Sequence, residues 1–533
     1  MRVGTSYKQH GIADNWDAIV IGSGIGGLAT AALLARHLHK RVLVLERHYT
    51  AGGFTHTFTR PGYEWDVGVH YIGDVQRPNS LMHRVFDHLS EGQLAWADMG
   101  EIYDTIVING DRYEFPRGEQ AFVARMKDYF PDYSQAIDRY IAQIKNAAKH
   151  SSMFFMEKAL PPFLASLIGP AMRWPAMRYG RRTLAEVFSE VGIPPGSRIA
   201  GVLSGQLGDY GLAPKEASFL MHAILVKHYL KGAGYPVGGS SRIAQSILPS
   251  IEKKGGKVMI SAEVDSVLFE GTKATGVLLT DGRKLFAPQI ISDAGWATTW
   301  GKLVPQELSE PWGLSSQIAG IQPSLGHAAL YVGAQKDSKT LGLSPSNIWV
   351  YPHEDHDKNL QAYLSHSKAP LPLAYLSFPA AKDPTFSTRF AGRSTIEVIG
   401  VAPYSRFSAF SDSRWKKRTD GYEALKQDLT ERLLEVLYEQ CPTLRGCVDH
   451  AELSTPLSTK HFSGHPHGEI YGLSHVPARF AYRALRPQTP FAGLYLTGSD
   501  ICTAGVGGAL MGGLFTASVV AKRNLFKAVL NDS

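Results

Sequence analysis

The chain has 533 residues and a net charge of +7. This length exceeds what one compact core organises, so we expect two or more domains. A hydrophobic fraction of 44% with 19% charged residues excludes a mainly disordered chain and favours a large α/β protein. The positive charge is not gathered in a long lysine-rich tail, so we expect no nucleic-acid partner.

The cysteine content indicates the redox state of the protein's compartment, and the apolar runs indicate how the chain can contact a membrane. Cys441, Cys447 and Cys502 are too few and too scattered for a disulfide framework, which favours a reducing compartment. The opening residues, MRVGTSYKQHGIADNWD, lack the apolar core of a secretory signal. No run of about 18 apolar residues is free of charge and proline. We therefore expect any membrane contact to be peripheral and on the cytoplasmic side.

The segment DAIVIGSGIGGLATAALLA indicates a dinucleotide site. A buried-strand pattern at residues 18–21 leads into Gly22-Ser23-Gly24 and Gly27, and an alanine- and leucine-rich helix follows. Gly22 permits the tight turn, Gly24 lets the backbone approach a pyrophosphate, and Gly27 lets the helix pack closely on the strand. The helix N-terminus then faces the phosphate charge. We predict that Gly22, Ser23, Gly24 and Gly27 bind the cofactor.

A second strand, RVLVLER, carries an acidic residue at its end. Glu46 lies nineteen residues after Gly27 and can accept hydrogen bonds from the adenosine ribose hydroxyls. Arg47 and, after it, Gly53 in a second glycine pair complete this part of the predicted cofactor site. Strand, glycines, helix, strand and acid in register favour a nucleotide site over an ordinary glycine-rich turn.

A second glycine-rich block near the C-terminus, GLYLTGSDICTAGVGGALMGG, favours FAD over NAD. A hydrophobic strand at residues 494–496 leads to Gly498 and Asp500, and a glycine-rich helix start follows. Asp500 can bind ribityl or pyrophosphate-side hydroxyls, and backbone N–H groups near Val506 and Gly508 can face the flavin ring. The alternative is a packed glycine-rich helix with an ordinary N-cap aspartate. No glycine fingerprint for a separate NAD(P) domain is visible in the sequence.

With these motifs, the chain resembles the phytoene desaturase, carotenoid isomerase and retinol saturase superfamily of FAD-dependent oxidoreductases, and it looks closest to the retinol saturase branch. The blocks that carry the resemblance are GGFTHTFTRPGYEWDVGVHYIG at 52–73, LGDYG at 207–211, SFLMHAILVKHYLKGAGYPVGG at 218–239, YLSFPAAKDPTF at 375–386 and GEIYGLSHVPARF at 468–480. The resemblance implies a Rossmann-like α/β FAD-binding domain of the amine oxidase type, non-covalent FAD, and a strand whose Val264 backbone meets the adenine.

The predicted FAD domain is discontinuous. It is assembled from residues 14–80, 236–300 and 485–533. Between these segments lie a mainly helical insertion at 81–235, which we expect to face substrate and membrane, and a strand-rich substrate domain at 301–484. A sheet covered by helices can form a long apolar pocket beside the flavin.

The stretch FFMEKALPPFLASLIGPAMRWPAMRYGRR, Phe154–Arg182, is unusually apolar for the chain. We expect its prolines to break it into segments too short to cross a bilayer. It can lie on one, with apolar side chains at the headgroup boundary. The residues expected to meet anionic lipid are Arg173, Arg178, Arg181 and Arg182. The alternative is a buried segment with solvated arginines.

An alkene or alkane chain offers no acidic group to activate. Hydride exchange with flavin N5 at one carbon, coupled to proton transfer at its neighbour, is the simplest route. The predicted catalytic residues for proton transfer are His70, Tyr71 and Tyr235, with His222 and His228 as further candidates. The alternative is that these histidines are packed structural residues. Saturation, desaturation and isomerisation would share such a site.

The segment HFSGHPHGEIYG has the composition of a metal site, but its irregular spacing and Gly and Pro content favour a loop, so we predict no metal. The leading hypothesis is an FAD-dependent oxidoreductase acting on carbon–carbon bonds of a long apolar, membrane-derived polyene of retinoid or carotenoid type. The rivals are a long-chain fatty acyl desaturase or saturase, a flavin amine oxidase, and a non-catalytic flavin-binding lipid carrier. No motif indicates the electron donor or acceptor, and an oligomer is compatible with the sequence.

Overall fold

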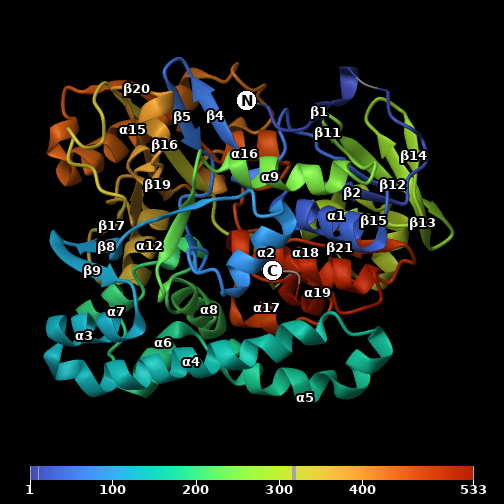
Figure 1. The fold of residues 1–533 in the computed structure, drawn as a ribbon. Helices are drawn as coiled ribbons and strands as arrows, with labels where there is room; N and C mark the ends of the chain where they lie inside the picture. The colour runs from blue at the N-terminus through green and yellow to red at the C-terminus, as the bar shows by residue number, and fades with distance from the viewer. Residues whose placement is uncertain (1, 10, 315–317, 319, 532–533) are drawn as a thin grey trace.

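Short apolar runs form a six-stranded parallel sheet in the computed structural model, which describes residues 2–9, 11–314, 318 and 320–531 (Figure 1). Runs such as AIVI and VLVL are buried at every position. The strands, in spatial order, are β1 (Thr5–Ser6), β11 (Lys257–Ile260), β3 (Val42–Leu45), β2 (Ala18–Ile21), β15 (Ile290–Ser292) and β21 (Leu494–Leu496). All five neighbouring pairs are parallel.

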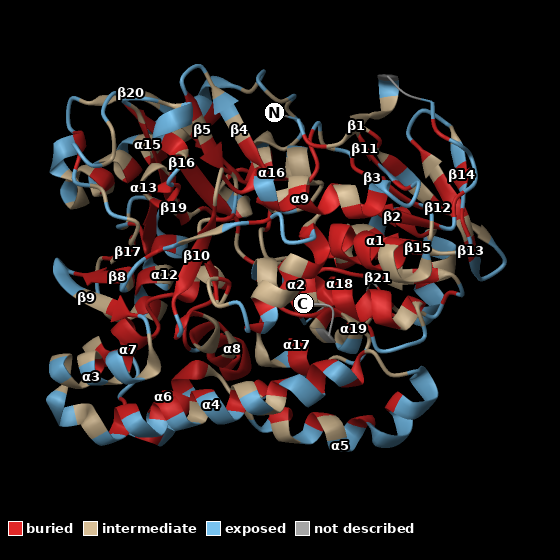
Figure 2. Ribbon diagram, viewed as in Figure 1, coloured by how far each residue is buried: buried red, intermediate tan, exposed pale blue. Residues whose placement is uncertain are grey.

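Both faces of this sheet are covered, which explains why its strands are apolar throughout. Helices α1 (Ile25–Leu38), α9 (Ser241–Glu252) and α18 (Gly505–Val520) pack on one face, in a core that includes Val20. A small antiparallel sheet covers the other face, in a core that includes Ile19. Its strands are β12 (Val264–Glu270), β13 (Lys273–Leu279) and β14 (Lys284–Phe286). Figure 2 shows this centre as buried.

A second sheet of seven strands is mixed. Its order is β20 (Val448–Ser454), β16 (His327–Ala334), β19 (Ser394–Val401), β18 (Ala374–Ser377), β17 (Asn347–Tyr351), β8 (Ile102–Ile108) and β9 (Asp111–Pro116). β17 and β8 are parallel, and the other neighbours are antiparallel. Helix α15 (Asp420–Gln440) packs on one face through Leu429 and Leu433. Trp349 and Tyr375 belong to a different core, shared with the helical layer.

The helical layer lies below both sheets in Figure 1. It consists of α3 (Glu119–Tyr129), α4 (Ser134–Glu157), α5 (Pro162–Gly180), α6 (Leu184–Val191), α7 (Arg198–Leu203) and α8 (Phe219–Tyr229). Helix α6 begins with a capping box, in which Thr183 and Glu186 each accept a hydrogen bond from the other's backbone N–H. The α4 and α5 helices form the outer edge of this layer.

Short strands and helices join these layers. Strands β4 (Thr57–Arg60) and β5 (Tyr63–Asp66) form a hairpin, and β10 (Ala233–Pro236) pairs between β6 (Ile72–Gly73) and β7 (Trp96–Asp98). Further helices are α2 (Leu81–Ser90), α12 (His356–Ser365), α17 (Pro477–Ala481) and α19 (Phe526–Asn531).

The predicted segment boundaries differ from the structure in two places. Strand β1 precedes residue 14 and pairs with β11 at the edge of the parallel sheet. Strands β8 and β9 lie inside the segment 81–235, which we expected to be mainly helical, yet they pair with the seven-stranded sheet. The run IYDTIVI in β8 is rich in β-branched residues, which favours a strand between the helical runs of that segment.

The proline-rich stretch at 154–182 is less broken than its prolines suggest. Its first apolar residues end α4, and residues 162–180 form one nineteen-residue helix, α5. Pro162 occupies the first turn, where a missing N–H costs nothing, and Pro170 and Pro175 lie within the helix. The prediction of short segments was therefore wrong, because a helix of this length tolerates two missing backbone hydrogen bonds. Within the described residues, no helix combines the length and apolar character that crossing a bilayer requires.

Candidate active site

A cavity of about 1300 Å³ connects the parallel sheet with the seven-stranded sheet. At one end it is lined by the glycine turn that follows β2 and by the residues after β3. At the other end its walls come from β17, β18 and α8. One continuous space therefore joins a dinucleotide-type turn to an aromatic chamber, an arrangement typical of sites where a cofactor meets a second ligand.

The turn after β2 has dinucleotide-binding geometry. Gly22 has a φ of +98°, a conformation that residues with a Cβ rarely adopt. Helix α1 begins directly after Gly24 with no side-chain cap, so its N-terminal N–H groups suit an anionic ligand. A Cβ on Gly27 would lie 2.5 Å from the carbonyl oxygen of Gly22. Glycine at this position therefore allows the close approach of helix and strand.

Glu46 follows β3 and lines the cavity. Its carboxylate accepts hydrogen bonds from the Ser23 N–H at 2.9 Å, the Ser23 hydroxyl at 2.7 Å and the His48 N–H at 2.7 Å. Ser23 is buried and does not belong to the cavity wall. Ser23 thus fixes the position of Glu46, and Glu46 faces the space where an adenosine ribose is expected.

Three other predicted cofactor residues line the same end of the cavity: Arg47, Gly53 and Val264. The guanidinium of Arg47 lies 3.8 Å from the carboxylate of Glu263. Gly53 has a φ of +54°, and a Cβ there would lie 3.0 Å from the Cα of Gly24. The two glycine motifs therefore pack directly against each other.

Helix α18 points its N-terminus into the cavity. Its N-cap residue, Ala504, provides no side-chain cap, and Val506 and Gly508 line the cavity wall. An uncapped helix N-terminus carries a partial positive charge and unpaired N–H groups. Two helix N-termini, those of α1 and α18, thus face one space.

Gly498 and Asp500 are not part of the cavity wall. The Asp500 carboxylate accepts hydrogen bonds from the N–H groups of Trp296 at 2.7 Å and Leu473 at 2.9 Å. It also lies 3.7 Å from the guanidinium of Arg479. Asp500 thus holds neighbouring loops together, and a contact of its side chain with a cofactor stays a prediction.

Asp293 lines the cavity but was not selected from the sequence. It directly follows β15, which is parallel to β2, so its carboxyl group lies beside the glycine turn. Burial, together with the carboxylates of Glu46 and Asp500, raises the pKa of Asp293 to about 8. The carboxyl is therefore mostly neutral at neutral pH and does not repel a pyrophosphate. An acidic residue at the C-terminal end of a buried parallel strand was the signal that could have found it.

His70 lines the cavity, and its Nδ1 lies 2.7 Å from Oε2 of Glu397 on β19. Burial lowers the pKa of His70 to about 3, and the nearby Lys382 ammonium adds to this effect. The imidazole is neutral, so its contact with Glu397 is a hydrogen bond rather than an ion pair. Lys382 also donates a hydrogen bond of 2.9 Å to the carbonyl oxygen of His70.

Tyr235 lies behind the cavity rather than in its wall. Its hydroxyl donates a 2.5 Å hydrogen bond to the Asp66 carboxyl, which also accepts from the Ser240 N–H at 2.9 Å. Burial, together with the neighbouring Glu397, raises the pKa of Asp66 to about 7. The structure therefore brings His70 to the cavity but not Tyr235, whose catalytic role stays a prediction without a contact to support it.

Tyr71 lines the cavity, and its hydroxyl lies between two carboxyl groups. The distances are 2.9 Å to Oδ2 of Asp104 and 3.1 Å to Oδ2 of Asp209. The Tyr71 ring stacks on Tyr229 with 4.3 Å between ring centroids. Sequence reasoning missed both acids, although an aspartate inside the apolar strand IYDTIVI signals a buried polar contact.

The further histidine candidates have different environments. His222 is buried, and its two ring nitrogens lie 2.6 Å from the Tyr140 hydroxyl and 3.1 Å from the Tyr210 hydroxyl. His228 lines the cavity, and its Nε2 accepts a 2.8 Å hydrogen bond from the Gly73 N–H. His222 is thus a structural residue of the helical layer, and His228 fixes the backbone beside β6.

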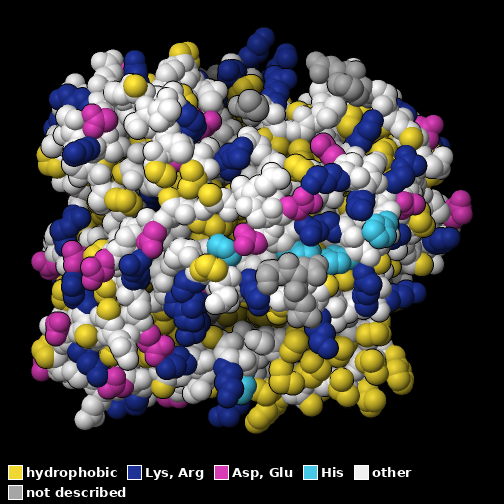
Figure 3. Space-filling view, in the orientation of Figure 1, with side chains coloured by type: hydrophobic (Ala, Val, Ile, Leu, Met, Phe, Trp, Pro, Cys, Tyr) yellow, Lys and Arg dark blue, Asp and Glu magenta, His cyan; other side chains and the backbone are white. Residues whose placement is uncertain are grey.

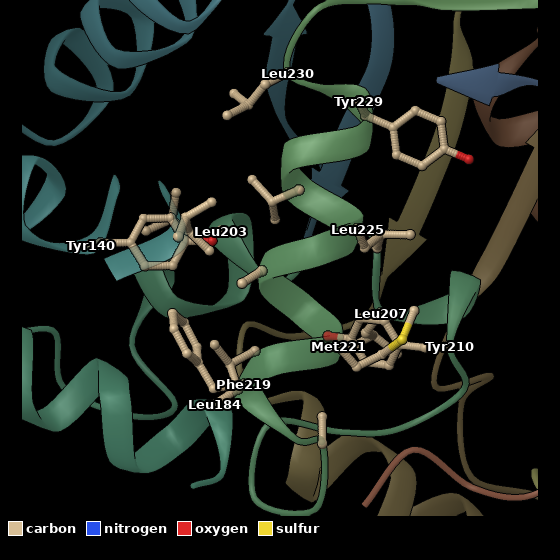
Figure 4. Close-up of a cluster of buried hydrophobic side chains, with 14 of the residues drawn as sticks. Tyr140, Leu184, Leu203, Leu207, Tyr210, Phe219, Met221, Leu225, Tyr229 and Leu230 are labelled. Carbon is tan, nitrogen blue, oxygen red and sulfur yellow. The ribbon is translucent and has the colours of Figure 1, made fainter. Parts of the chain in front are cut away.

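Helix α8 of the helical layer forms part of the cavity wall. In Figure 4, Met221, Leu225 and Tyr229 project to one side of this helix, and Tyr140 and Leu184 lie on the other. The first three line the cavity, whereas the other two are buried in the core of the helical layer. The chamber wall is therefore mainly apolar and aromatic, and it is supported from behind by close packing.

The histidine-rich loop does not form a metal cluster. Among the residues that the structure describes, no group of three or more His, Cys, Asp or Glu side chains is placed to hold a metal ion. His461 stacks on Trp415, and the Nδ1 of His465 lies 2.5 Å from the carbonyl oxygen of Glu469.

Comparisons with known proteins agree with this geometry. Residues 20–89 match the family model of an NAD(P)-binding Rossmann-like domain. All-trans-retinol 13,14-reductase of Danio rerio is 36% identical over 96% of this chain and 87% of its own length. The chloroplastic prolycopene isomerase of Arabidopsis thaliana is 26% identical over 94% of this chain and 81% of its own length.

A solved structure shows the same fold at low identity. Cyclohexylamine oxidase from Brevibacterium oxydans superimposes with a TM-score of 0.59 at 16% identity, covering 97% of this chain and 99% of that one. The chain therefore belongs to the all-trans-retinol 13,14-reductase, or retinol saturase, branch of the phytoene desaturase and carotenoid isomerase superfamily of FAD-dependent oxidoreductases.

Proposed function

We propose that this protein uses non-covalently bound FAD to saturate a carbon–carbon double bond of a long apolar substrate of retinoid or carotenoid type. The observation that carries the proposal is the continuous cavity that joins the dinucleotide turn to the aromatic chamber. A flavin and a polyene can meet there away from bulk water. Saturation is favoured over isomerisation because the reductase relative is 36% identical and the isomerase 26%.

The dinucleotide end of the cavity fits FAD. The uncapped N-terminus of α1 suits the pyrophosphate, Glu46 suits the adenosine ribose, and the backbone at Val264 suits the adenine. The N-terminus of α18, at Val506 and Gly508, suits the electron-rich edge of the flavin ring. When bound, FAD supplies hydride exchange at N5.

At the reacting end, the protein's own side chains orient the substrate and handle protons. Because Nδ1 of His70 is bonded to Glu397, its Nε2 is the ring nitrogen that can exchange a proton with a ligand. Tyr71 also lines this space, and its hydroxyl bonds to the carboxyl groups of Asp104 and Asp209. The surrounding aromatic walls exclude water from a polyene and favour its burial.

Membrane association is the second part of this proposal, and α5 is its proposed contact surface. Phe163, Leu167 and Trp174 are 75%, 69% and 64% exposed, respectively. Figure 3 shows apolar side chains gathered at the end of the molecule that α5 forms. Helix α5 contains no acidic residue, and Arg178 and Arg181 are exposed at its C-terminal end. An apolar face flanked by arginines fits the headgroup region of an anionic bilayer.

Arg173 does not belong to this surface, and its predicted contact with lipid was wrong. It is buried, lies 3.9 Å from the carboxylate of Glu157, and donates a 2.8 Å hydrogen bond to the carbonyl oxygen of Phe480 on α17. Arg173 lies four residues after Gly169, which is also buried, so both share the inner face of α5.

Two exposed apolar residues lie in the cavity wall. Leu81 of α2 and Met156 near the end of α4 line the cavity and are also exposed large hydrophobic residues. Met156 lies six residues before Pro162, where α5 begins. An apolar substrate can thus pass from a membrane that contacts α5 into the cavity with little exposure to water.

The test is to purify the protein with membrane present, record its visible spectrum, and extract its ligands for mass spectrometry. Released FAD with a co-purified polyene supports the proposed function. FAD with fatty acyl chains alone would favour an acyl substrate, and turnover of amines would favour an amine oxidase. FAD that no donor reduces would favour a lipid carrier, and protein without FAD would contradict all flavin-dependent functions.

A further inference from the structure

We propose that Asp209 is a neutral carboxylic acid that donates the proton to the substrate chain, and that Tyr71 and Asp104 keep it poised for this step. The inference rests on the function proposed above and adds a catalytic acid to it. Three structural observations support it: a shared hydroxyl, an unequal distribution of hydrogen-bond donors, and the position of Asp209 in the cavity wall.

The Tyr71 hydroxyl has two carboxyl neighbours but one hydrogen. It lies 2.9 Å from Asp104 and 3.1 Å from Asp209, both within hydrogen-bond distance. A hydroxyl donates one hydrogen bond, and an ionised carboxylate only accepts. If Tyr71 donates to one carboxylate, the other carboxyl group must carry a proton and donate to Tyr71. The geometry therefore requires one neutral acid in this pair.

Asp104 has the environment of the ionised member. Its Oδ1 accepts a 2.8 Å hydrogen bond from the Asn347 side-chain amide, and its Oδ2 accepts a 2.7 Å bond from the Gln206 amide. Together with Tyr71, these are three donors, which stabilise a carboxylate. The buried ammonium of Lys382 donates a 2.5 Å hydrogen bond to the side-chain oxygen of Asn347 and adds a nearby positive charge.

Asp209 has the environment of the neutral member. Among the described residues, the Tyr71 hydroxyl is the group within hydrogen-bond distance of its carboxyl oxygens. Burial raises the pKa of Asp209 well above its usual range, and the charge of Asp104 raises it further. The titratable groups around Asp209 are Asp104 and the tyrosines Tyr71, Tyr210, Tyr229, Tyr351, Tyr375 and Tyr471.

The two acids also differ in access to a ligand. Asp209 lines the cavity and is partly accessible within it, whereas Asp104 is fully buried behind Tyr71. A proton on Asp209 can therefore reach a carbon atom in the cavity directly. Asp104 is not itself in the cavity wall but bonds to the wall residue Tyr71, so its role is to position and polarise.

Saturation of a double bond needs one hydride and one proton. One carbon of the double bond would take up the hydride that bound, reduced FAD supplies, and the π electron pair would form the bond between the neighbouring carbon and the proton of Asp209. The O–H bond of Asp209 breaks and leaves a carboxylate. The Tyr71 hydrogen then turns from Asp104 to Asp209, while Asp104 keeps its bonds to Asn347 and Gln206. After product leaves, water returns a proton to Asp209.

The test is infrared difference spectroscopy of the FAD-loaded protein, which needs no turnover. The wild-type minus Asp209→Asn difference should contain the carbonyl band of a neutral carboxylic acid that shifts in heavy water. The exposed residue Asp265 on β12 provides the matched control, because Asp265→Asn should leave that region unchanged. In Asp104→Asn the acid should ionise at lower pH, because Tyr71 is then free to donate to Asp209.

A difference spectrum that shows loss of a carboxylate instead of a neutral acid would overturn the inference. So would Asp104→Asn with an unchanged titration of Asp209. With turnover as a second readout, Asp209→Asn should slow product formation by about 100-fold or more, while FAD content and reduction by dithionite stay unchanged. Absence of turnover in the wild type would contradict the proposed function separately, since the infrared result does not depend on turnover.

Discussion

The Glu397 carboxyl group on β19 lies 2.7 Å from Nδ1 of His70, in the segment that connects β5 to β6. Glu397 also accepts a 2.7 Å hydrogen bond from the N–H of Asp66, the last residue of β5. The seven-stranded sheet thus fixes the backbone and the side chain that close the cavity on the side of the dinucleotide domain. Burial raises the pKa of Glu397 to about 8, and Lys382 opposes this shift.

We predict that Glu397→Ala lowers the free energy of unfolding by about 2–6 kcal/mol, because it leaves two buried groups, Nδ1 of His70 and the Asp66 N–H, without their hydrogen-bond partner. Glu397→Gln should cost less, since its amide oxygen can still accept hydrogen bonds. Thermal unfolding at a fixed heating rate measures the effect. Glu439→Ala, at an exposed position on α15, is the control. Equal midpoints for Glu397→Ala and the control would show that the network contributes nothing.

Gly24→Ala should abolish FAD retention. A Cβ at Gly24 would lie 2.5 Å from Oδ2 of Asp293 and would occupy the approach to the pyrophosphate. The control is Gly11→Ala, because a Cβ at Gly11 meets no atom within 4 Å. The ratio of flavin to protein after gel filtration should fall at least tenfold, about 1.4 kcal/mol of binding energy, in the first variant only. Normal flavin content in Gly24→Ala would contradict the assignment of this turn.

FAD affinity should fall as pH rises through about 8, the pKa to which burial raises Asp293. Below this pH the carboxyl is neutral beside the pyrophosphate, and above it the carboxylate repels the ligand. In Asp293→Asn, titration of the apo-protein with FAD should show a weaker pH dependence over this range. An unchanged dependence would mean that Asp293 does not face the pyrophosphate.

Asp293 should also make the free energy of unfolding depend on pH. Because its folded-state pKa of about 8 exceeds the ordinary 3.8, the folded protein holds a proton that the unfolded chain has lost. Its contribution to the free energy of unfolding therefore decreases as pH rises from about 4 to about 8. Asp293→Asn lacks this term, so its stability relative to wild type should improve over that interval. A relative stability that stays constant or declines would contradict the buried neutral form.

Leu167→Asp should release the protein from vesicles of mixed neutral and anionic lipid, because it places a charge on the most apolar face of α5. Leu364→Asp is the matched control, since Leu364 on α12 is also an exposed leucine, at 47%. Replacing Arg178 and Arg181 with Glu should weaken binding to anionic vesicles more than to neutral ones. Flotation with vesicles measures all three, and equal loss in Leu364→Asp would exclude α5 as the specific contact.

The dinucleotide turn was predictable because its physical demands are local. Gly22, Gly24 and Gly27 follow from one strand–turn–helix unit, and Glu46 follows from the next strand. The structure places all four as that pattern requires, with Glu46 in the cavity wall. The position of Asp293 beside Gly24 was not predicted, because it depends on the pairing of β15 with β2, which are far apart in sequence.

The chemistry at the other end of the cavity was less predictable, because it is assembled by tertiary contacts. Asp104 and Asp209 meet at Tyr71 from separate elements, and no local spacing encodes that meeting. Tyr235 belongs to the block at 218–239 that carries the family resemblance. In the structure, however, its hydroxyl bonds to Asp66. In a similar way, the sequence of α5 shows its arginines but not that Arg173 turns inward to Glu157.

The most direct test of the proposed function is a single-turnover experiment without oxygen. FAD-loaded protein is reduced with dithionite, freed of excess reductant, and mixed with all-trans-retinol while flavin absorbance and product mass are followed. We predict that the flavin is reoxidised as the substrate gains two hydrogen atoms and loses one conjugated double bond. Flavin that stays reduced with retinol unchanged, or a product of unaltered mass, would contradict saturation by this protein.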